Sequence, residues 1–188
     1  SVNRTSNGRG KVFELKWDYL SRLDAGSKFG DQFTGEPLPL LEQVFEELGG
    51  KLLINVELKN YATPRDNLTE LVMDLIKKMG LGEGVILSSF NGSNLLKAKA
   101  IDPAIRRGLL TMPGLAGSLH RGWYGRRFAY TALHPYHRDA RLAVVRSLHQ
   151  QGKQVNVWTV DNPADLLKMR DCQVDMVICN NPQQARKV

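Results

Sequence analysis

Two charged residues, Glu57 and Lys59, stand at the end of an apolar segment, where charge is costly to bury. The segment KLLINVELKN, residues 51–60, places leucine, isoleucine and valine ahead of them. A spacing of two puts both side chains on the same face of a β-strand. Such a pair could bind a cation and an anion side by side, or it could be a simple ion pair on an exposed strand end.

Other polar and aromatic residues stand at the ends of similar segments. They are Ser88, Phe90, Thr111, His134, Trp158 and Asn180. Alternation in QVNVWTV (154–160) places Asn156 and Trp158 on one strand face and two valines on the other. The aromatic residues could also be core side chains, and the histidine a hydrogen-bonded structural residue. If these segments are neighbouring parallel strands, their ends form one rim on which a site can be built.

The elements that must position these residues alternate along the chain. Apolar segments predict strands at 51–58, 84–90, 105–111, 128–135, 154–160 and 175–180. Between them, apolar residues at helical spacing predict helices at 64–80, 91–102, 136–152 and 162–171. Starts about 20 to 33 residues apart suit a strand plus a crossover helix. The sequence therefore predicts a mostly parallel sheet covered by helices.

Two architectures fit this alternation: an open doubly wound sheet and a (β/α)8 barrel. No glycine-rich phosphate loop follows any predicted strand, which argues against a nucleotide-binding open sheet. The polar strand ends favour the barrel. Only six of its eight strands are visible, because residues 1–37 indicate loops and residues 38–50 a helix. We therefore expect one barrel domain over 1–188, with 1–37 as an insertion or loop region, 38–188 carrying β/α repeats, and two strands preceding Ser1.

The net charge of +7 suggests an anionic partner or substrate. From Pro103 to Lys153 the only acid is Asp139, among nine arginine and lysine residues. No nucleic-acid motif accompanies this charge, so a solvated basic face is the simplest explanation and nucleic acid is not an expected partner. No run approaches the roughly 20 apolar residues of a membrane span. Two cysteines form no disulfide framework, leaving the compartment open, with the cytoplasm as the default expectation.

Several stretches, taken together and in order, are similar to one enzyme family. They are NRTSNGRGKV, LSRLDAGSKFGDQFTGEPLPLLEQVFEEL, LLINVELK, VILSSF, LHPY, GKQVNVWTVDNP and VDMVICNNP. This combination resembles the glycerophosphodiester phosphodiesterase family. The resemblance implies a (β/α)8 TIM barrel that hydrolyses a glycerophosphodiester to glycerol 3-phosphate and an alcohol, using a divalent cation, Ca²⁺ or Mg²⁺.

The resemblance also assigns roles to residues of this chain. Glu57 corresponds to a metal ligand and Lys59 to a residue that faces the phosphate. Trp158 is expected to line the glycerol side of the substrate, as is Phe90, and His134 matches a position at the rim of the site. A cation and a fixed ammonium are what the growing charge of phosphodiester hydrolysis requires.

The family's two catalytic histidines lie in an HRG motif and an HD motif, and the resemblance places both before Ser1, together with two further metal carboxylates. We therefore expect residues 1–188 alone to lack activity. The tripeptide HRG at 120–122 lies in a basic, glycine-rich loop and is expected to be a coincidence. The alternatives are a non-catalytic barrel that acts as a binding module, and a barrel enzyme acting on a phosphosugar.

Overall fold

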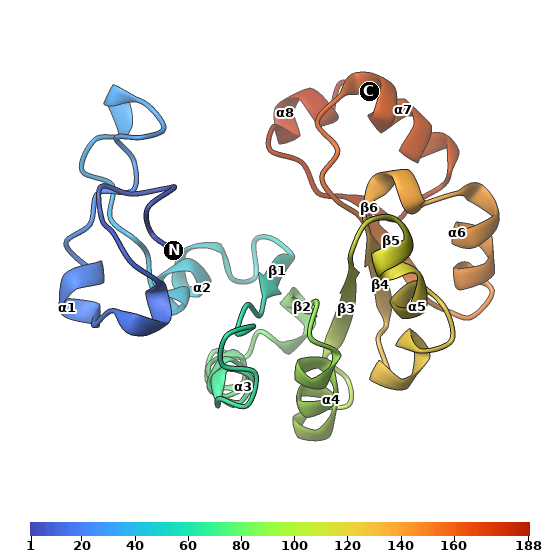
Figure 1. The fold of residues 1–188 in the computed structure, drawn as a ribbon, viewed down its shortest axis with the longest axis horizontal. Helices are drawn as coiled ribbons and strands as arrows, with labels where there is room; N and C mark the ends of the chain where they lie inside the picture. The colour runs from blue at the N-terminus through green and yellow to red at the C-terminus, as the bar shows by residue number, and fades with distance from the viewer. The chain divides into compact units, whose positions relative to one another are not determined.

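The computed structural model describes residues 1–188, which divide into two compact units, Ser1–Gly49 and Gly50–Val188 (Figure 1). The first unit consists of loops with short helical turns and two α-helices, α1 (Trp17–Leu20) and α2 (Leu41–Leu48). Its small core contains Val2, Leu20 and Leu23. One isolated antiparallel bridge joins Asp24 to Pro37, and the unit contains no strand, as predicted.

The second unit is built on a parallel sheet of six strands in the order β1 to β6. The strands are β1 (Ile54–Glu57), β2 (Val85–Ser89), β3 (Arg106–Thr111), β4 (Ala132–Pro135), β5 (Gln154–Val157) and β6 (Met176–Val177). Each neighbour in sequence is also the neighbour in space, as a singly wound barrel requires. The sheet curls as part of a barrel and contains all six predicted strands. Several of them are shorter than predicted: β1 begins at 54 rather than 51, β4 begins at 132 rather than 128, β5 ends at 157 rather than 160, and β6 covers only 176–177.

Helices follow the strands and cover one face of the sheet (Figure 1). They are α3 (Leu68–Lys78), α4 (Gly92–Ile101), α5 (Ser118–Arg121), α6 (Leu142–His149), α7 (Pro163–Asp171) and α8 (Pro182–Ala185). The main core lies between this face and the helices, where Leu133 and Val155 of the sheet belong to the same cluster as Val145 and Met169. Burial of these apolar side chains is the main driving force for the fold.

Two helices begin later than the hydrophobic pattern predicts. Helix α3 starts at Leu68 rather than near Pro64, because the Asp66 carboxylate accepts bonds from the Thr63 hydroxyl (2.7 Å) and the Leu68 amide (3.1 Å). These bonds fold residues 61–67 into turns. Helix α6 starts at Leu142 rather than near Tyr136, and a short 3-10 turn occupies 137–139. No helix is long and apolar enough to span a bilayer.

Candidate active site

Glu57 and Lys59 lie together at the carboxyl end of β1 and form an ion pair, with 3.1 Å between the Lys59 Nζ and Glu57 Oε2 atoms. The second carboxylate oxygen, Oε1, accepts a hydrogen bond from the Tyr61 hydroxyl at 3.3 Å. The Lys59 side chain remains 64% exposed, so its ammonium can still reach a ligand. Burial and the Glu57 carboxylate raise the pKa of Tyr61 to about 12, which keeps the phenol protonated as a donor.

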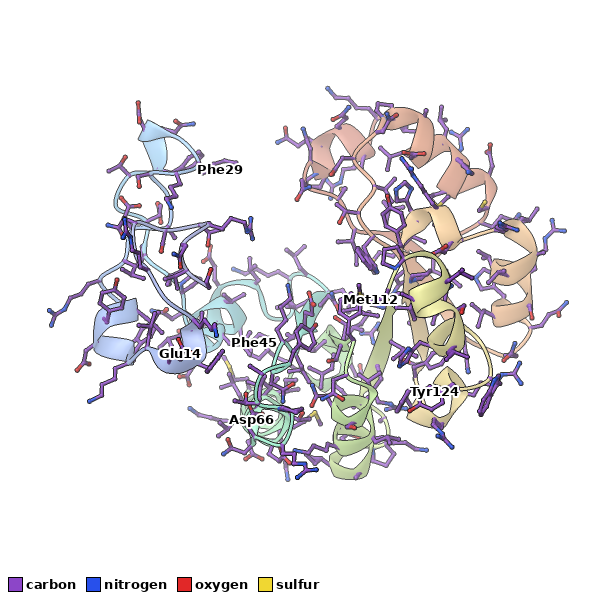
Figure 2. The ribbon with its side chains drawn as sticks, in the orientation of Figure 1. Glu14, Phe29, Phe45, Asp66, Met112 and Tyr124 are labelled. Atoms are coloured by element: carbon purple, nitrogen blue, oxygen red, sulfur yellow. The ribbon has the colours of Figure 1, made fainter.

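A buried polar network fixes the chain that carries this pair. The Ser89 hydroxyl donates to the carbonyl of Leu58 at 2.8 Å, which ties the end of β1 to β2. The Asn94 amide, fully buried on α4, donates to Asn60 Oδ1 (2.8 Å) and Ser89 Oγ (3.2 Å). Asn60 in turn donates to Asp66 at 2.7 Å, beside the start of α3 (Figure 2). Lys59 therefore stands between two residues, Leu58 and Asn60, that are held firmly in place.

Four aromatic rings make a continuous row beside the ion pair. Tyr61 meets Phe90 with 6.1 Å between ring centroids, Phe90 meets Trp158 at 5.6 Å, and Trp158 meets Tyr136 at 5.7 Å. We call Tyr61, Phe90, Trp158 and Tyr136 the aromatic row. Phe90 follows β2 and Trp158 follows β5, and these strands are separated by two others. Their contact therefore shows that the sheet curls far enough to bring distant strand ends together.

His134 supports the aromatic row from within the sheet. Its carbonyl accepts a hydrogen bond from the Trp158 indole at 2.8 Å, which sets the orientation of that ring. The imidazole is only 1% exposed, and burial lowers the pKa of His134 to about 4. The Asn156 amide nitrogen lies 3.0 Å from Nε2, and as a donor it requires Nε2 to accept. The ring is therefore neutral and carries its proton on Nδ1.

The face of the sheet opposite the helices is unusually polar. His134 and Asn156 are on this face, because their neighbours Leu133 and Val155 point into the helix-side core. Ser88 is also on it, since Ser89 bonds to α4 on the other side. Ser88 Oγ, His134 Nδ1 and Asn156 Oδ1 are buried without a protein partner. Buried polar atoms of this kind normally bind water or a ligand, so the inner face is suited to polar contents.

The residues present do not by themselves complete a cation site. Ca²⁺ takes six to eight oxygen ligands and Mg²⁺ six. Glu57 supplies one carboxylate, and both of its oxygens contact protein donors, Lys59 and Tyr61. No group of three or more histidine, cysteine, aspartate or glutamate side chains is placed to hold a metal ion. A cation at Glu57 therefore needs further ligands.

The structure brings together four of the residues that the sequence singled out, Glu57, Lys59, Phe90 and Trp158, with His134 directly behind them. Two others lie elsewhere. Leu110 pairs with His134 and shares its face of the sheet, so the next residue, Thr111, lies on the helix side. Asn180 forms a hydrogen bond with Asp161 at 2.7 Å.

Sequence reasoning missed Tyr61 and Tyr136, which complete the aromatic row. Both follow a candidate residue by two positions, Tyr61 after Lys59 and Tyr136 after His134. That spacing was the available signal. The sequence analysis treats HRG at 120–122 as a coincidence; His120 lies in α5, in the crossover between β3 and β4, and stacks on Phe128.

The site can be compared with known proteins. The family model described as "Glycerophosphoryl diester phosphodiesterase family" matches residues 1–184. A glycerophosphodiester phosphodiesterase from Caldanaerobacter subterraneus subsp. tengcongensis is 35% identical over 184 residues, which are 97% of this chain and 74% of that protein.

Solved structures share the fold. An Oleispira antarctica phosphodiesterase in complex with the product sn-glycerol-3-phosphate is 24% identical, with a TM-score of 0.81 over 98% of this chain and 74% of that chain. A glycerophosphodiester phosphodiesterase from Agrobacterium tumefaciens is 23% identical, with a TM-score of 0.80 over 99% of this chain and 77% of that one. From the sequence match and the shared barrel architecture it follows that the chain belongs to the glycerophosphoryl diester phosphodiesterase family.

Proposed function

We propose that the protein hydrolyses glycerophosphodiesters to glycerol 3-phosphate and an alcohol at the carboxyl edge of the sheet. The observation that supports this most is the Glu57–Lys59 pair, held at a strand end beside the aromatic row. Family membership supports the choice of substrate, as does the 35% identity to the Caldanaerobacter phosphodiesterase. In barrels of this kind the carboxyl edge is where catalytic residues gather.

Lys59 is proposed to contact the phosphate. Its ammonium is a compact positive charge with three donors, and its exposed side chain can turn from Glu57 toward an anion. Phosphodiester hydrolysis places more negative charge on the phosphoryl oxygens in the transition state than in the substrate. A fixed ammonium near those oxygens therefore lowers the barrier as well as aiding binding.

The aromatic row is proposed to bind the glycerol side of the substrate. Trp158 and Phe90 are half-buried and held edge to face, so each offers a rigid apolar surface. The Oleispira protein, which shares the fold, contains sn-glycerol-3-phosphate. Glycerol 3-phosphate joins a three-carbon chain to a phosphate, which matches the apolar surface of the aromatic row next to the Lys59 ammonium. His134 is proposed to position Trp158 through its carbonyl, since its own ring is buried.

Glu57 is proposed to supply one ligand to a divalent cation, Ca²⁺ or Mg²⁺. Carboxylate oxygens are the ligands that both ions prefer. Such a cation would add positive charge next to the phosphate. The remaining ligands are not among the groups gathered at this edge, and the proposed roles of Lys59 and the aromatic row do not depend on the cation.

The proposal is tested by binding and turnover. Calorimetric titration with glycerol 3-phosphate should show binding that weakens about tenfold or more in Lys59→Gln, because the ammonium contact to the phosphate is lost. Lys51→Gln is the matched control, since Lys51 is an exposed lysine at the other end of the β1 segment and should change nothing. Turnover is followed as release of glycerol 3-phosphate from glycerophosphocholine and glycerophosphoethanolamine.

The outcomes separate the two functions considered for the chain. Release of glycerol 3-phosphate, reduced in Lys59→Gln, supports the hydrolase. Because the family's catalytic histidines are expected before Ser1, turnover is measured on the chain with the residues encoded upstream of Ser1 included. Binding of glycerol 3-phosphate by that chain with no release from any glycerophosphodiester tested, with and without Ca²⁺ or Mg²⁺, would favour a non-catalytic binding module. Equal affinity in Lys59→Gln and Lys51→Gln would remove Lys59 from the site.

A further inference from the structure

The crossover between β3 and β4 exposes large apolar side chains to solvent. Leu115 is 90% exposed, Leu119 61% and Trp123 69%, and Met112 is also exposed. We call Met112, Leu115, Leu119 and Trp123 the outer strip. Single exposed apolar residues are ordinary, but four large ones within twelve positions mark a binding surface.

The outer strip is held in place from its inner side. His120 stacks on Phe128 with 5.9 Å between ring centroids, and Tyr124 meets Phe128 at 5.4 Å. The backbone is packed just as closely, because a Cβ atom added at Gly117 would lie 1.8 Å from the Met112 carbonyl oxygen. One added at Gly125 would lie 1.8 Å from that of His120. The apolar residues are therefore displayed by a packed segment.

The segment that carries the outer strip is basic. Residues 112–128 contain three arginines and no acid, and Asp139 is the only acid from Pro103 to Lys153. Asp139 is already engaged, with its Oδ2 atom 3.1 Å from Arg121 Nη1 and 2.9 Å from the Gly114 amide. Arg126 and Arg127 are exposed and have no carboxylate partner. With Arg121 paired to Asp139, Arg126 and Arg127 give the segment that carries the outer strip a net positive charge.

The outer strip lies close to the edge of the sheet that carries the candidate active site. Met112 directly follows the carboxyl end of β3, and Gly114 bonds to Asp139, which follows the carboxyl end of β4. Phe128 packs over Gly92, the first residue of α4 just past β2. A surface that binds the outer strip would therefore be next to the mouth of the site.

We propose that the outer strip and its flanking arginines dock the protein on an anionic lipid bilayer. Leucine, methionine and tryptophan side chains insert at the boundary between headgroups and acyl chains, and tryptophan favours that zone. Arginines beside them are attracted to anionic headgroups. A second copy of the chain fits this surface less well. A two-fold interface brings the same face of each copy together, so two positively charged surfaces would repel each other.

The test is sedimentation of the full chain with large vesicles, made either of phosphatidylcholine alone or of phosphatidylcholine with phosphatidylglycerol. We expect binding to the mixed vesicles, weaker binding to the neutral ones, and loss as salt is added. The triple variant Leu115→Ser, Leu119→Ser, Trp123→Ser should lose about tenfold or more in partitioning. Arg126→Gln with Arg127→Gln should weaken binding to the mixed vesicles and leave the neutral ones unchanged.

The matched control is Leu71→Ser, Leu96→Ser, Leu167→Ser, which removes three exposed leucines from other helices. It should bind vesicles as the parent does, and the thermal midpoints of all variants check the fold. Equal loss in the control triple variant, or no binding of the parent chain to either vesicle, overturns the proposal. So does light scattering that shows a dimer which the outer-strip variant converts to a monomer, because the strip is then a protein interface.

Discussion

At the scale of single residues, His134 shows most clearly how burial determines the protonation state of a side chain. Its ring lies on the inner face of the sheet, where it is removed from water and where no acidic side chain offsets the cost of a positive charge. The single bond from Asn156 is also satisfied by the neutral form. A charged His134 would therefore disturb the support beneath Trp158.

This predicts an acid-sensitive fold. The pKa of His134 is about 4 in the folded protein and about 6.5 when exposed, so the unfolded chain takes up the proton first. Stability due to the neutral ring is complete above pH 6.5 and is lost as the pH falls toward 4. At about 1.4 kcal/mol per pH unit, the loss reaches about 3 kcal/mol. Urea unfolding at a series of pH values measures it, and His134→Gln should flatten the decline.

The comparison of the parent protein with His134→Gln is its own control, because carboxylates elsewhere contribute equally to the pH dependence of stability in both. Parallel declines in the parent and in His134→Gln would show that the imidazole is not the group responsible.

Some residues of the candidate site could be predicted from the sequence and others could not. Glu57 and Lys59 could be found because two charges at the end of an apolar strand are conspicuous, and alternation placed them on one face. Tyr61 could not be assigned in the same way. It lies beyond the strand, where turns at 61–67 decide its direction. Those turns are held by the bond between Asn60 and Asp66, and Asn60 is itself held by Asn94, which is 34 residues away in sequence.

At the scale of elements, all six strands were predicted, as were the bounds of α4 and α7 to within one residue, while the starts of α3 and α6 were not. A buried parallel strand needs only a short apolar run, which is local information. The start of α3 depends on Asp66, whose partners lie in the turns before the helix and at its first residue. Ahead of α6, residues 137–139 form a 3-10 turn. A proline or tyrosine at a plausible first position does not reveal such bonds. The helical periodicity was correct in all four predicted helices, and the predicted starts were wrong in α3 and α6.

The contact between β3 and β4 gives a prediction at this scale. A Cβ atom added at Gly108 would lie 2.4 Å from the His134 Nε2 atom, so glycine is what lets the imidazole lie across β3. Gly108→Ala should destabilise the protein by about 1–3 kcal/mol through overpacking. Urea unfolding at neutral pH measures the change.

Gly84→Ala is its control, because nothing lies within 4 Å of the added atom there. It should change stability by less than about 0.5 kcal/mol. The double variant Gly108→Ala, His134→Ala should recover part of the loss. If it recovers none, the strain in Gly108→Ala does not come from the imidazole.

At the scale of the whole molecule, the barrel architecture was predictable because strand and helix segments alternate and no phosphate loop is present. The division at Gly49 and Gly50 was not predicted. The sequence indicated a helix that ends at this glycine pair, but nothing in its pattern separates the end of a helix from the end of a compact unit. That distinction depends on which contacts cross the boundary.

The boundary predicts where the chain is cut. Gly50, Lys51, Leu52 and Leu53 are all exposed and precede the first residue of β1. Exposed segments between compact units are preferred sites for proteases. Brief digestion with trypsin should therefore cleave early after Lys51, giving fragments 1–51 and 52–188 that mass spectrometry identifies.

Lys51→Gln should remove that early product and leave later cleavages unchanged. If the earliest product instead arises within α3 to α7, the boundary at Gly49 and Gly50 is not the most accessible part of the chain.

The hydrogen bond from the Trp158 indole to the His134 carbonyl has an optical consequence. The polar end of this fluorophore is shielded by the protein, while part of its ring surface is open beside Phe90. Its emission should therefore respond to what rests on the open ring and little to bulk solvent. With Trp17 and Trp123 replaced by phenylalanine, the protein would carry a single built-in fluorescent reporter of occupancy at the sheet's rim, with no label attached.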